Sequence, residues 1–274
     1  MRYPKCNLHT HTTYCDGANT PEEMVLEAIR LGMTTLGFSG HSYTSFDTCS
    51  MTEQGTAEYR TEVARLKQKY ADQIRILCGI EQDFCSPPVA EGYNYIIGSV
   101  HYLLKDGEYH SVDADVETFR KAVDEHFGGD VYKFIREYYE TLAQVAEKTK
   151  CDIIGHFDLV EKFNGDGQLF DSTDYRYRRP AIDALDELLK KDRIFEINTG
   201  AIGRGYRKMP YPSPYLLRRI AEKRGRVMIN SDAHKKEQLL CAFGDAIQFA
   251  HSCGVGGLTV PTEYGWEVRP LGSA

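Results

Sequence analysis

Short apolar runs in this chain repeatedly end in a histidine or a carboxylate. Six of the nine histidines stand at or near the ends of such runs. The runs are rich in β-branched residues and have the length of buried strands. Chance would scatter the histidines, so the pattern predicts parallel strands whose carboxyl ends aim polar side chains at one place. The runs are Cys6–His11, Thr35–His41, Ile74–Glu81, Asn94–His101, Cys151–Asp158 and Arg226–His234.

Amphipathic segments separate these runs. Thr20, Pro21 and Glu23 are typical of a helix start, and Gly32 of its end. Helical periodicity also predicts helices near 57–70, 130–149, 175–191, 213–225 and 236–252, whereas 105–130 is less regular and has the character of an insertion. A further strand, Arg193–Gly200, raises the strand count to seven. This alternation predicts an α/β fold, a (β/α) barrel one strand short of the usual eight, and a single domain over 1–274.

Composition and charge exclude several classes of partner. The net charge is −7 and the chain has no basic stripe, which argues against a duplex-binding protein. No apolar run is long enough to span a membrane. The eight cysteines form no CxxC pair and are expected to be free thiols in a reducing cytoplasm. The segment Met1–His9 contains no signal-peptide core. We therefore expect a cytoplasmic protein with a small-molecule partner, and neither nucleic acid nor membrane as partner.

Several of the polar residues at the run ends could hold a cation. His9 and His11 are two residues apart on one strand, so both imidazoles face the same side. Asp232 and His234 repeat this spacing. Glu81 ends a run that should be buried, where a carboxylate is costly unless it is paired or binds a metal. Hydrogen-bonded core histidines are the plain alternative, but the whole set of histidines and acids favours a metal site.

Six motifs occur along the chain in a recognisable order: HTHTTYCDG (9–17), FSGH (38–41), GIE (79–81), GSVH (98–101), GHFD (155–158) and SDAH (231–234). In this order they resemble the PHP (polymerase and histidinol phosphatase) superfamily. The segments GSVHYL, FEINTGAIGRG and YPSPYLL resemble its histidinol-phosphatase branch. The resemblance implies a distorted seven-stranded barrel, a trinuclear metal site at the carboxyl ends of the strands, and hydrolysis of L-histidinol phosphate in histidine biosynthesis.

The resemblance also implies which residues hold the metals. One ion is expected on His9, His11, Glu81 and Asp232. A second shares Glu81 and adds His101 and His156, and a third takes Asp16, His41 and His234. We thus expect two to three divalent ions. Nitrogen and carboxylate ligands suit zinc, iron or manganese, and the sequence does not choose among them.

The substrate explains why several metals are expected. A phosphate monoester is dianionic and hydrolyses very slowly without catalysis. Clustered cations neutralise its oxygens and lower the pKa of a bridging water. We hypothesise that the resulting hydroxide attacks phosphorus without a covalent phospho-enzyme. Asp232, His234 and Glu81 are the expected catalytic residues, and Asp232 and His234 are possible proton donors to the leaving alkoxide.

Substrate binding needs charges outside the ligand set. Arg204 and Arg207 follow the sixth strand on the expected catalytic face. Arg204 is favoured for bidentate binding of phosphate because glycines flank it, and a solvated loop arginine is the alternative. Lys162 and Asn198 are further candidates. Asp83 suits the ammonium group of an amino-alcohol phosphate.

Two rival functions stay open at this point. One is another phosphoesterase of the same superfamily, acting on nucleotides, nucleic-acid ends or phosphotyrosine. The other is a non-catalytic metal-binding module, which the complete ligand set disfavours. The remaining histidines, His110, His126 and His251, lie outside the motifs and are expected at the surface or on helices.

Overall fold

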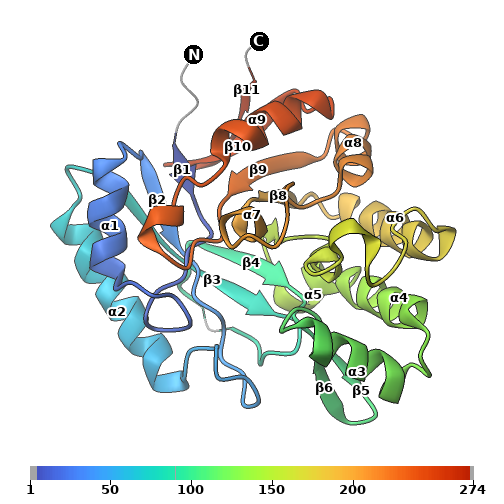
Figure 1. Cartoon of the computed structure of the whole chain (residues 1–274). Helices are drawn as coiled ribbons and strands as arrows, with labels where there is room; N and C mark the ends of the chain where they lie inside the picture. Colours follow the sequence, from blue (N-terminus) through green and yellow to red (C-terminus); the bar gives the residue numbers. More distant parts are fainter. Residues whose placement is uncertain (1–4, 90, 272–274) are drawn as a thin grey trace.

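The computed structural model describes residues 5–89 and 91–271. The first four residues of the segment 1–9, in which no signal-peptide core is expected, therefore lie outside the described residues. Seven strands form one parallel sheet in the order β1-β2-β3-β4-β7-β8-β9 (Figure 1). They are β1 (Cys6–Asn7), β2 (Thr35–Phe38), β3 (Arg75–Asp83), β4 (Tyr95–Ser99), β7 (Ile153–Ile154), β8 (Ile194–Asn198) and β9 (Arg226–Asn230).

Contacts between the two edge strands nearly close this sheet into a barrel. Thr10 and Ala233 form a parallel bridge, and the His11 amide donates to the Ala233 carbonyl at 2.8 Å. The Leu8 amide donates to Oδ1 of Asn230, also at 2.8 Å. The predicted seven-stranded barrel is confirmed, and its closure brings the residues after β1 beside those after β9.

Helices cover the outside of the barrel (Figure 1). The predicted start of the first helix is confirmed, because Thr20 Oγ1 accepts from the Glu23 amide at 3.3 Å and the Glu23 carboxylate accepts from the Thr20 amide at 2.9 Å. The helices are α1 (Pro21–Arg30), α2 (Glu53–Lys69), α4 (Val131–Leu142), α5 (Val145–Thr149), α6 (Tyr175–Leu189), α7 (Gly200–Gly203), α8 (Pro214–Glu222) and α9 (Phe243–Ser252).

Tyr95 crosses the barrel interior. Its hydroxyl contacts the carbonyl oxygens of Leu8 at 2.5 Å and Phe38 at 2.9 Å. Leu8 directly follows β1 and Phe38 ends β2, and neither strand pairs with β4. Gly37 and Gly79 make room for the ring, since a Cβ at these positions would lie 2.4 and 2.3 Å from its atoms. The filled interior leaves the open carboxyl end as the place for a site.

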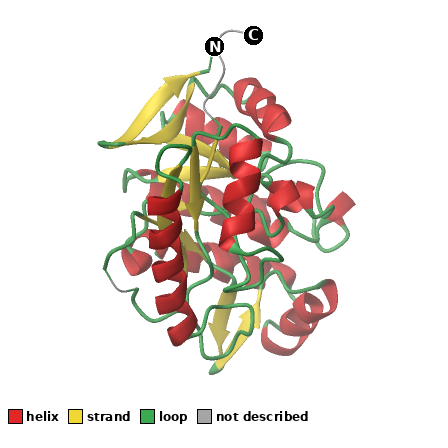
Figure 2. Ribbon diagram, turned by 90° about the vertical axis from the view of Figure 1, so that its left-hand side faces the viewer, coloured by secondary structure: helices red, strands yellow, loops and turns green. Residues whose placement is uncertain are grey.

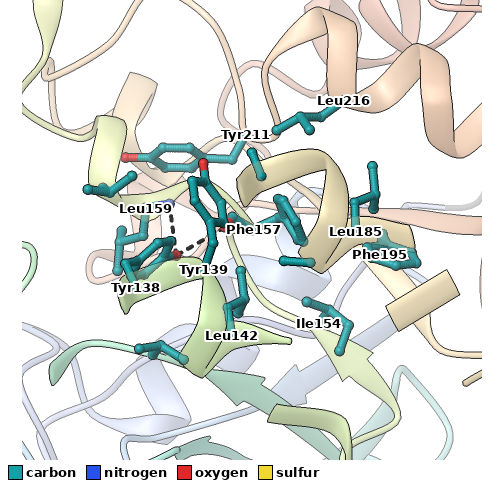
Figure 3. Packing of buried hydrophobic residues seen from close by; sticks show 14 of the residues in the cluster. Tyr138, Tyr139, Leu142, Ile154, Phe157, Leu159, Leu185, Phe195, Tyr211 and Leu216 are labelled. Carbon is teal, nitrogen blue, oxygen red and sulfur yellow. Dashed lines mark hydrogen bonds between the residues drawn. The ribbon is translucent and has the colours of Figure 1, made fainter. Parts of the chain in front are cut away.

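The packing of α4 fixes the segment that follows β7. The Tyr138 hydroxyl donates to the Phe157 carbonyl at 3.0 Å and accepts from the Leu159 amide at 3.2 Å (Figure 3). Tyr138, Phe157 and Leu159 are buried in the same apolar cluster. This packing holds the backbone immediately after His156, which is one of the predicted ligands.

The segment 105–130 is more regular than predicted. Strands β5 (Tyr102–Lys105) and β6 (Glu108–Ser111) form an antiparallel hairpin, and α3 (Val116–His126) follows. Asp106 and Gly107 have φ angles of 52° and 84°, as a two-residue turn of this kind requires. Because β5 follows β4 directly, the hairpin extends from the carboxyl end of the barrel, far from the β10–β11 end (Figure 2).

Two predicted helices are interrupted. The segment 236–252 begins as a short 3-10 helix, η3 (Lys236–Gln238), and α9 starts only after Ala242, whose φ of 54° breaks the helix. The segment 130–149 divides between α4 and α5 at Ala143 and Gln144. The run after residue 256 becomes β10 (Gly257–Thr262), paired with β11 (Gly265–Pro270). Within the described residues, we find no helix with the length and apolar character needed to cross a bilayer.

Candidate metal centre

The structure brings all nine predicted ligands together at the carboxyl end of the barrel. Glu81 lies on β3 itself, and the other eight lie in the segments that follow β1, β2, β4, β7 and β9. Strand geometry explains this, since the carboxyl ends of parallel strands meet at one edge. The eight are His9, His11, Asp16, His41, His101, His156, Asp232 and His234.

One oxygen of Glu81 contacts three imidazoles. Glu81 is 1% exposed, and its Oε2 lies 3.1 Å from His9 Nε2, 3.5 Å from His11 Nε2 and 3.0 Å from His41 Nδ1. Oδ1 of Asp232 closes the group at 3.2 Å from His11 Nε2 and 3.6 Å from His9 Nε2. These atoms surround a single point, which is the arrangement that the first expected ion requires.

The other oxygen of Glu81 forms a second group. Its Oε1 lies 2.9 Å from His156 Nε2 and 3.4 Å from His101 Nε2, and it accepts from the Ser99 hydroxyl at 2.7 Å. The two oxygens of one carboxylate therefore face two separate sets of nitrogen atoms. Such a carboxylate can bridge two cations.

Asp16 is the centre of a third, more exposed group. Its Oδ2 lies 3.0 Å from His234 Nε2, and its Oδ1 lies 3.6 Å from both His41 Nε2 and His11 Nδ1. His11 and His41 thus present their second nitrogen to this group while the first faces Glu81. The three groups are contiguous.

Unsatisfied buried atoms indicate that cations fit here. Among the described residues, His9 Nε2, His11 Nε2 and Glu81 Oε2 are buried without a hydrogen-bond partner. Buried polar atoms without partners are rare and cost about 1–3 kcal/mol each. All three face the same point, so one cation would satisfy them together. The donor set of nitrogens and carboxylate oxygens fits a divalent transition metal.

The electrostatics of the cluster point the same way. Burial lowers the pKa of His9, but the carboxylates of Glu196 and Glu81 outweigh it and hold that pKa well above its usual range. For His101, burial is likewise outweighed, by Glu81 and Asp83, and the pKa rises to about 9. By contrast, burial and the charges of His234 and His41 lower the pKa of His11 to about 3. Protons on some histidines thus supply the positive charge that the buried carboxylates require.

Metal binding should therefore release protons near neutral pH. The pKa values of His9, His41 and His101 are all raised, so these imidazoles are protonated before the metal enters and must lose those protons to ligate it. Zinc titrations by calorimetry, in buffers with different ionisation enthalpies, should show heats that depend on the buffer. Heats that are the same in every buffer would contradict this protonation pattern.

Glu196 on β8 is a site residue that the sequence analysis missed. Its Oε1 lies 2.7 Å from His9 Nδ1 and accepts from Asn230 Nδ2 at 2.9 Å. Its Oε2 accepts from the His156 amide at 2.9 Å and from Asn198 Nδ2 at 2.8 Å. The proton on His9 Nδ1 leaves Nε2 free to face the centre. The detectable signal was a carboxylate inside an apolar strand, the same argument that singled out Glu81.

Replacing Glu196 by glutamine should weaken zinc binding about 10- to 100-fold. The carboxylate accepts from donors on both oxygens, so an amide NH₂ must face one of them and misplace His9 or His156. Zinc affinity measured against a chelator tests this, with Glu187→Gln on the surface of α6 as the matched control. Equal affinity of the two variants would show that Glu196 does not position the ligands.

A cavity of about 280 Å³ opens over the cluster. Two of the predicted substrate-binding residues, Arg204 and Lys162, line it. Arg204 donates from Nη2 to Asp232 Oδ2 at 3.0 Å and from Nη1 to His234 Nδ1 at 2.8 Å. Since arginine only donates, Nδ1 of His234 must accept, and its Nε2 faces Asp16. Arg204 is thus held at the edge of the cluster with its charge facing the cavity.

Arg207, Asn198 and Asp83 do not belong to the described residues that line the cavity. The Arg207 guanidinium lies over the Tyr211 ring, 4.6 Å from its centroid. Asn198 is fully buried and donates to Glu196. Asp83 Oδ2 accepts from the His101 amide at 2.8 Å and lies 3.2 Å from His101 Nδ1. Asn198 and Asp83 therefore lie behind the predicted ligands.

Two cavity-lining carboxylates, Asp47 and Asp113, were not predicted. Asp113 accepts from Lys162 Nζ at 2.8 Å. Asp47 belongs to the loop after β2, where the Phe46 ring stacks on Tyr109 at 3.7 Å and meets Tyr102 edge-on at 5.0 Å. The β5–β6 hairpin thus holds this loop beside the cavity. Loop residues follow no periodic pattern, so neither carboxylate could be predicted from the sequence.

Fold and site together define a class of protein: an α/β barrel whose strand ends carry a histidine and carboxylate cluster suited to several divalent cations. The sequence model of the PHP domain matches residues 7–200. A protein from Deinococcus radiodurans named "Probable histidinol-phosphatase" is 31% identical, over 93% of this chain and 95% of its own length. The chain therefore belongs to the PHP domain family.

Further relatives agree with this assignment. The histidinol-phosphatase of Bacillus subtilis is 24% identical over 83% of this chain and 92% of its own length. A crystal structure from Listeria monocytogenes has the same fold, with a TM-score of 0.75, 22% identity and coverage of 88% of this chain and 99% of its own. A second crystal structure is that of a histidinol phosphate phosphatase from Lactococcus lactis, solved with zinc, L-histidinol and phosphate. Its TM-score is 0.72 at 20% identity, over 96% of this chain and 98% of its own length.

Proposed function

We propose that this protein is a metal-dependent hydrolase that converts L-histidinol phosphate to L-histidinol and inorganic phosphate. The observation that carries the proposal is Glu81, a buried carboxylate whose two oxygens face two sets of imidazole nitrogens beneath a cavity. The curated relatives with histidinol-phosphatase names support the substrate. This activity would be a step of histidine biosynthesis in the cytoplasm. We further propose that residues 1–274 form a single domain.

We also propose that the centre holds two to three ions of zinc, iron or manganese. The three contiguous ligand groups support three, with His9, His11, Glu81 and Asp232 on the first ion. The zinc in the Lactococcus lactis structure supports that metal. When bound, the ions neutralise phosphate oxygens and lower the pKa of water.

The residues around the cavity suit the two ends of this substrate. Arg204 and Lys162 offer positive charge to the phosphate, and arginine can bind it with two parallel hydrogen bonds. Asp47 offers negative charge to the ammonium group, whereas Asp113 pairs with Lys162 at 2.8 Å. In this arrangement Asp47 takes the role that the sequence suggested for Asp83. Arg207, Asn198 and Asp83 would then act by positioning their neighbours.

The reaction transfers a phosphoryl group to water. The water oxygen forms a bond to phosphorus, the bond from phosphorus to the substrate alcohol oxygen breaks, and that oxygen takes up a proton. Burial raises the pKa of Asp232, but Arg204 and His9 outweigh it and hold that pKa well below its usual range. Asp232 is therefore ionised and is suited to hold a cation through Oδ1, rather than to donate a proton to the leaving oxygen. His234 also lines the cavity and is, like Asp232, both a proposed catalytic residue and a proposed metal ligand.

A substrate panel tests this proposal. Phosphate release by the zinc- or manganese-loaded protein is measured on L-histidinol phosphate, AMP, a bisphosphonucleotide, phosphotyrosine and p-nitrophenyl phosphate. We expect kcat/KM on L-histidinol phosphate to exceed the others by at least about a hundredfold, because this substrate brings both an ammonium and an imidazole group to a cavity lined by the half-buried carboxylate of Asp47. A flat or nucleotide-biased profile would retire the substrate assignment while leaving the metal centre in place.

A further inference from the structure

A second group of histidines and carboxylates lies outside the centre, between the β5–β6 hairpin and α3. One ligand atom each from Glu108, His110 and His126 lies within 4.8 Å of the others. Asp106 lies at the edge of this group, 3.4 Å from His126 Nδ1. We propose that Glu108, His110 and His126 bind a divalent cation of the zinc class, distinct from the ions of the centre.

Local structure brings the four residues together. The turn at Asp106 and Gly107 reverses the chain, so Glu108 starts β6. Glu108 and His110 are two residues apart on this strand and therefore point to the same face. His126 is the last residue of α3, which packs against β6. A strand and the end of a helix thus present their ligands to each other, and a fixed backbone on both sides lowers the entropy cost of binding an ion.

Distances within the group fit a shared ion better than direct hydrogen bonds. The His110 and His126 rings lie 4.0 Å apart between centroids, with planes inclined by 42°. His126 Nε2 lies 3.9 Å from Glu108 Oε2, which is longer than an ordinary hydrogen bond. The opposite ring nitrogen, Nδ1, contacts Asp106 Oδ2 at 3.4 Å, so Asp106 orients the ring rather than facing the same point as Glu108. Two ligands of a tetrahedral zinc ion lie about 3.4 Å apart, since each is about 2.1 Å from the metal.

Charge around the group favours a cation. The carboxylates of Asp106, Glu108 and Glu125 all lie within 4.0 Å of a His126 nitrogen. The nearby Lys105 does not neutralise them, because its Nζ is paired with Glu137 at 2.8 Å. The carboxyl end of α3 adds partial negative charge where His126 lies. Nitrogen and carboxylate ligands together are those that zinc takes in proteins.

An ion here would tie the tip of the hairpin to α3. The other end of the same hairpin forms part of the cavity wall, since Tyr102 and Ser111 line the cavity and Tyr102 directly follows His101. The hairpin and α3 lie together at one side of the barrel (Figure 1). The ion would therefore stabilise the wall of the active cavity from outside it. This inference does not depend on the identity of the substrate.

Zinc anomalous diffraction from crystals of the full chain tests the site directly. We expect a peak about 2.1 Å from nitrogens of both His110 and His126, in addition to peaks at the centre. The peak should disappear in Glu108→Gln/His126→Gln crystals, whereas the peaks at the centre should stay. Peaks at the centre with none between His110 and His126 would overturn the proposal.

Zinc content measured in solution tests whether the ion also binds outside the crystal, rather than at crystal concentration only. Wild type, Glu108→Gln, Glu108→Gln/His126→Gln and the control His251→Gln are dialysed against one chelator-buffered zinc solution. We expect the double variant to hold one zinc ion fewer than wild type and the control, with kcat unchanged. Glu108 is 73% exposed, so the single variant will fold and should bind this zinc ion more weakly, even if the double variant does not fold. Equal zinc content in wild type and Glu108→Gln across the zinc titration would overturn the site.

Discussion

Replacing Glu81 by glutamine should lower kcat/KM on L-histidinol phosphate by about a thousandfold or more. Both oxygens of this carboxylate face imidazole nitrogens, so its charge serves two groups of ligands at once. Burial raises the pKa of Glu81, but His9 and His101 outweigh it and keep the carboxylate ionised. An amide removes that charge and turns an NH₂ toward ligand nitrogens. Loss of a bridging ligand should cost several kcal/mol of transition-state stabilisation, about tenfold in rate for each 1.4 kcal/mol.

Steady-state kinetics and metal content, measured on the same samples, check this expectation. The matched control is Glu187→Gln, because Glu187 lies exposed on α6 and pairs only with Lys190 among the described residues. The control should retain both activity and metal. If Glu81→Gln kept its metal and lost less than about tenfold in kcat/KM, the bridging role of Glu81 would be wrong.

Replacing Arg204 by alanine should lower kcat/KM by more than about a hundredfold. Arg204 lines the cavity, and a hydrogen bond to a charged group contributes about 1.5–3 kcal/mol. The substitution also leaves Asp232 without the partner that donates to its Oδ2 at 3.0 Å. Both the phosphate and a proposed metal ligand thus lose a contact, so KM should rise and kcat should fall.

Arg207→Lys is the informative comparison. Arg207 lies three residues further along the same loop, but its guanidinium packs over Tyr211 and lies 3.8 Å from Glu161 instead of lining the cavity. Lysine keeps the charge, so this variant should change KM little. Steady-state kinetics on both variants decides between the two arginines. A larger rise in KM for Arg207→Lys than for Arg204→Ala would contradict the proposed phosphate site.

Much of the fold was predictable because strand ends carry a local signal. Apolar runs such as Asn94–His101 show both the strand and the polar residue at its end. The helix start at Thr20 was predictable for the same reason, since its capping residues are neighbours in sequence. The hairpin after Tyr102 was missed, although Asp106-Gly107 is a strong hairpin signal. Ala242 could not be predicted as a helix break, because alanine favours helices and the left-handed φ is set by tertiary packing.

The site likewise contains residues that local sequence predicts and residues whose roles depend on tertiary packing. The nine proposed ligands lie in sequence motifs, and barrel topology then brings them together. The sequence alone could not distinguish the residues that hydrogen-bond the ligands or their partners from the residues that contact the substrate. Asp83 and Asn198 follow the right strands, but only the structure shows that they bond His101 and Glu196. Asp47 and Asp113 come from loops whose path depends on packing across the cavity, such as Phe46 on Tyr109.

The most direct test of the central claim is the kcat/KM of the metal-stripped protein on L-histidinol phosphate, before and after zinc is restored. The cluster of Glu81, Asp232 and surrounding histidines should be inactive without cations. We therefore predict that stripping abolishes phosphate release and that zinc, iron or manganese restores it, while the Glu81→Gln variant stays inactive with every metal. Full activity in the stripped protein, or no activity on this substrate with any metal, would contradict the account.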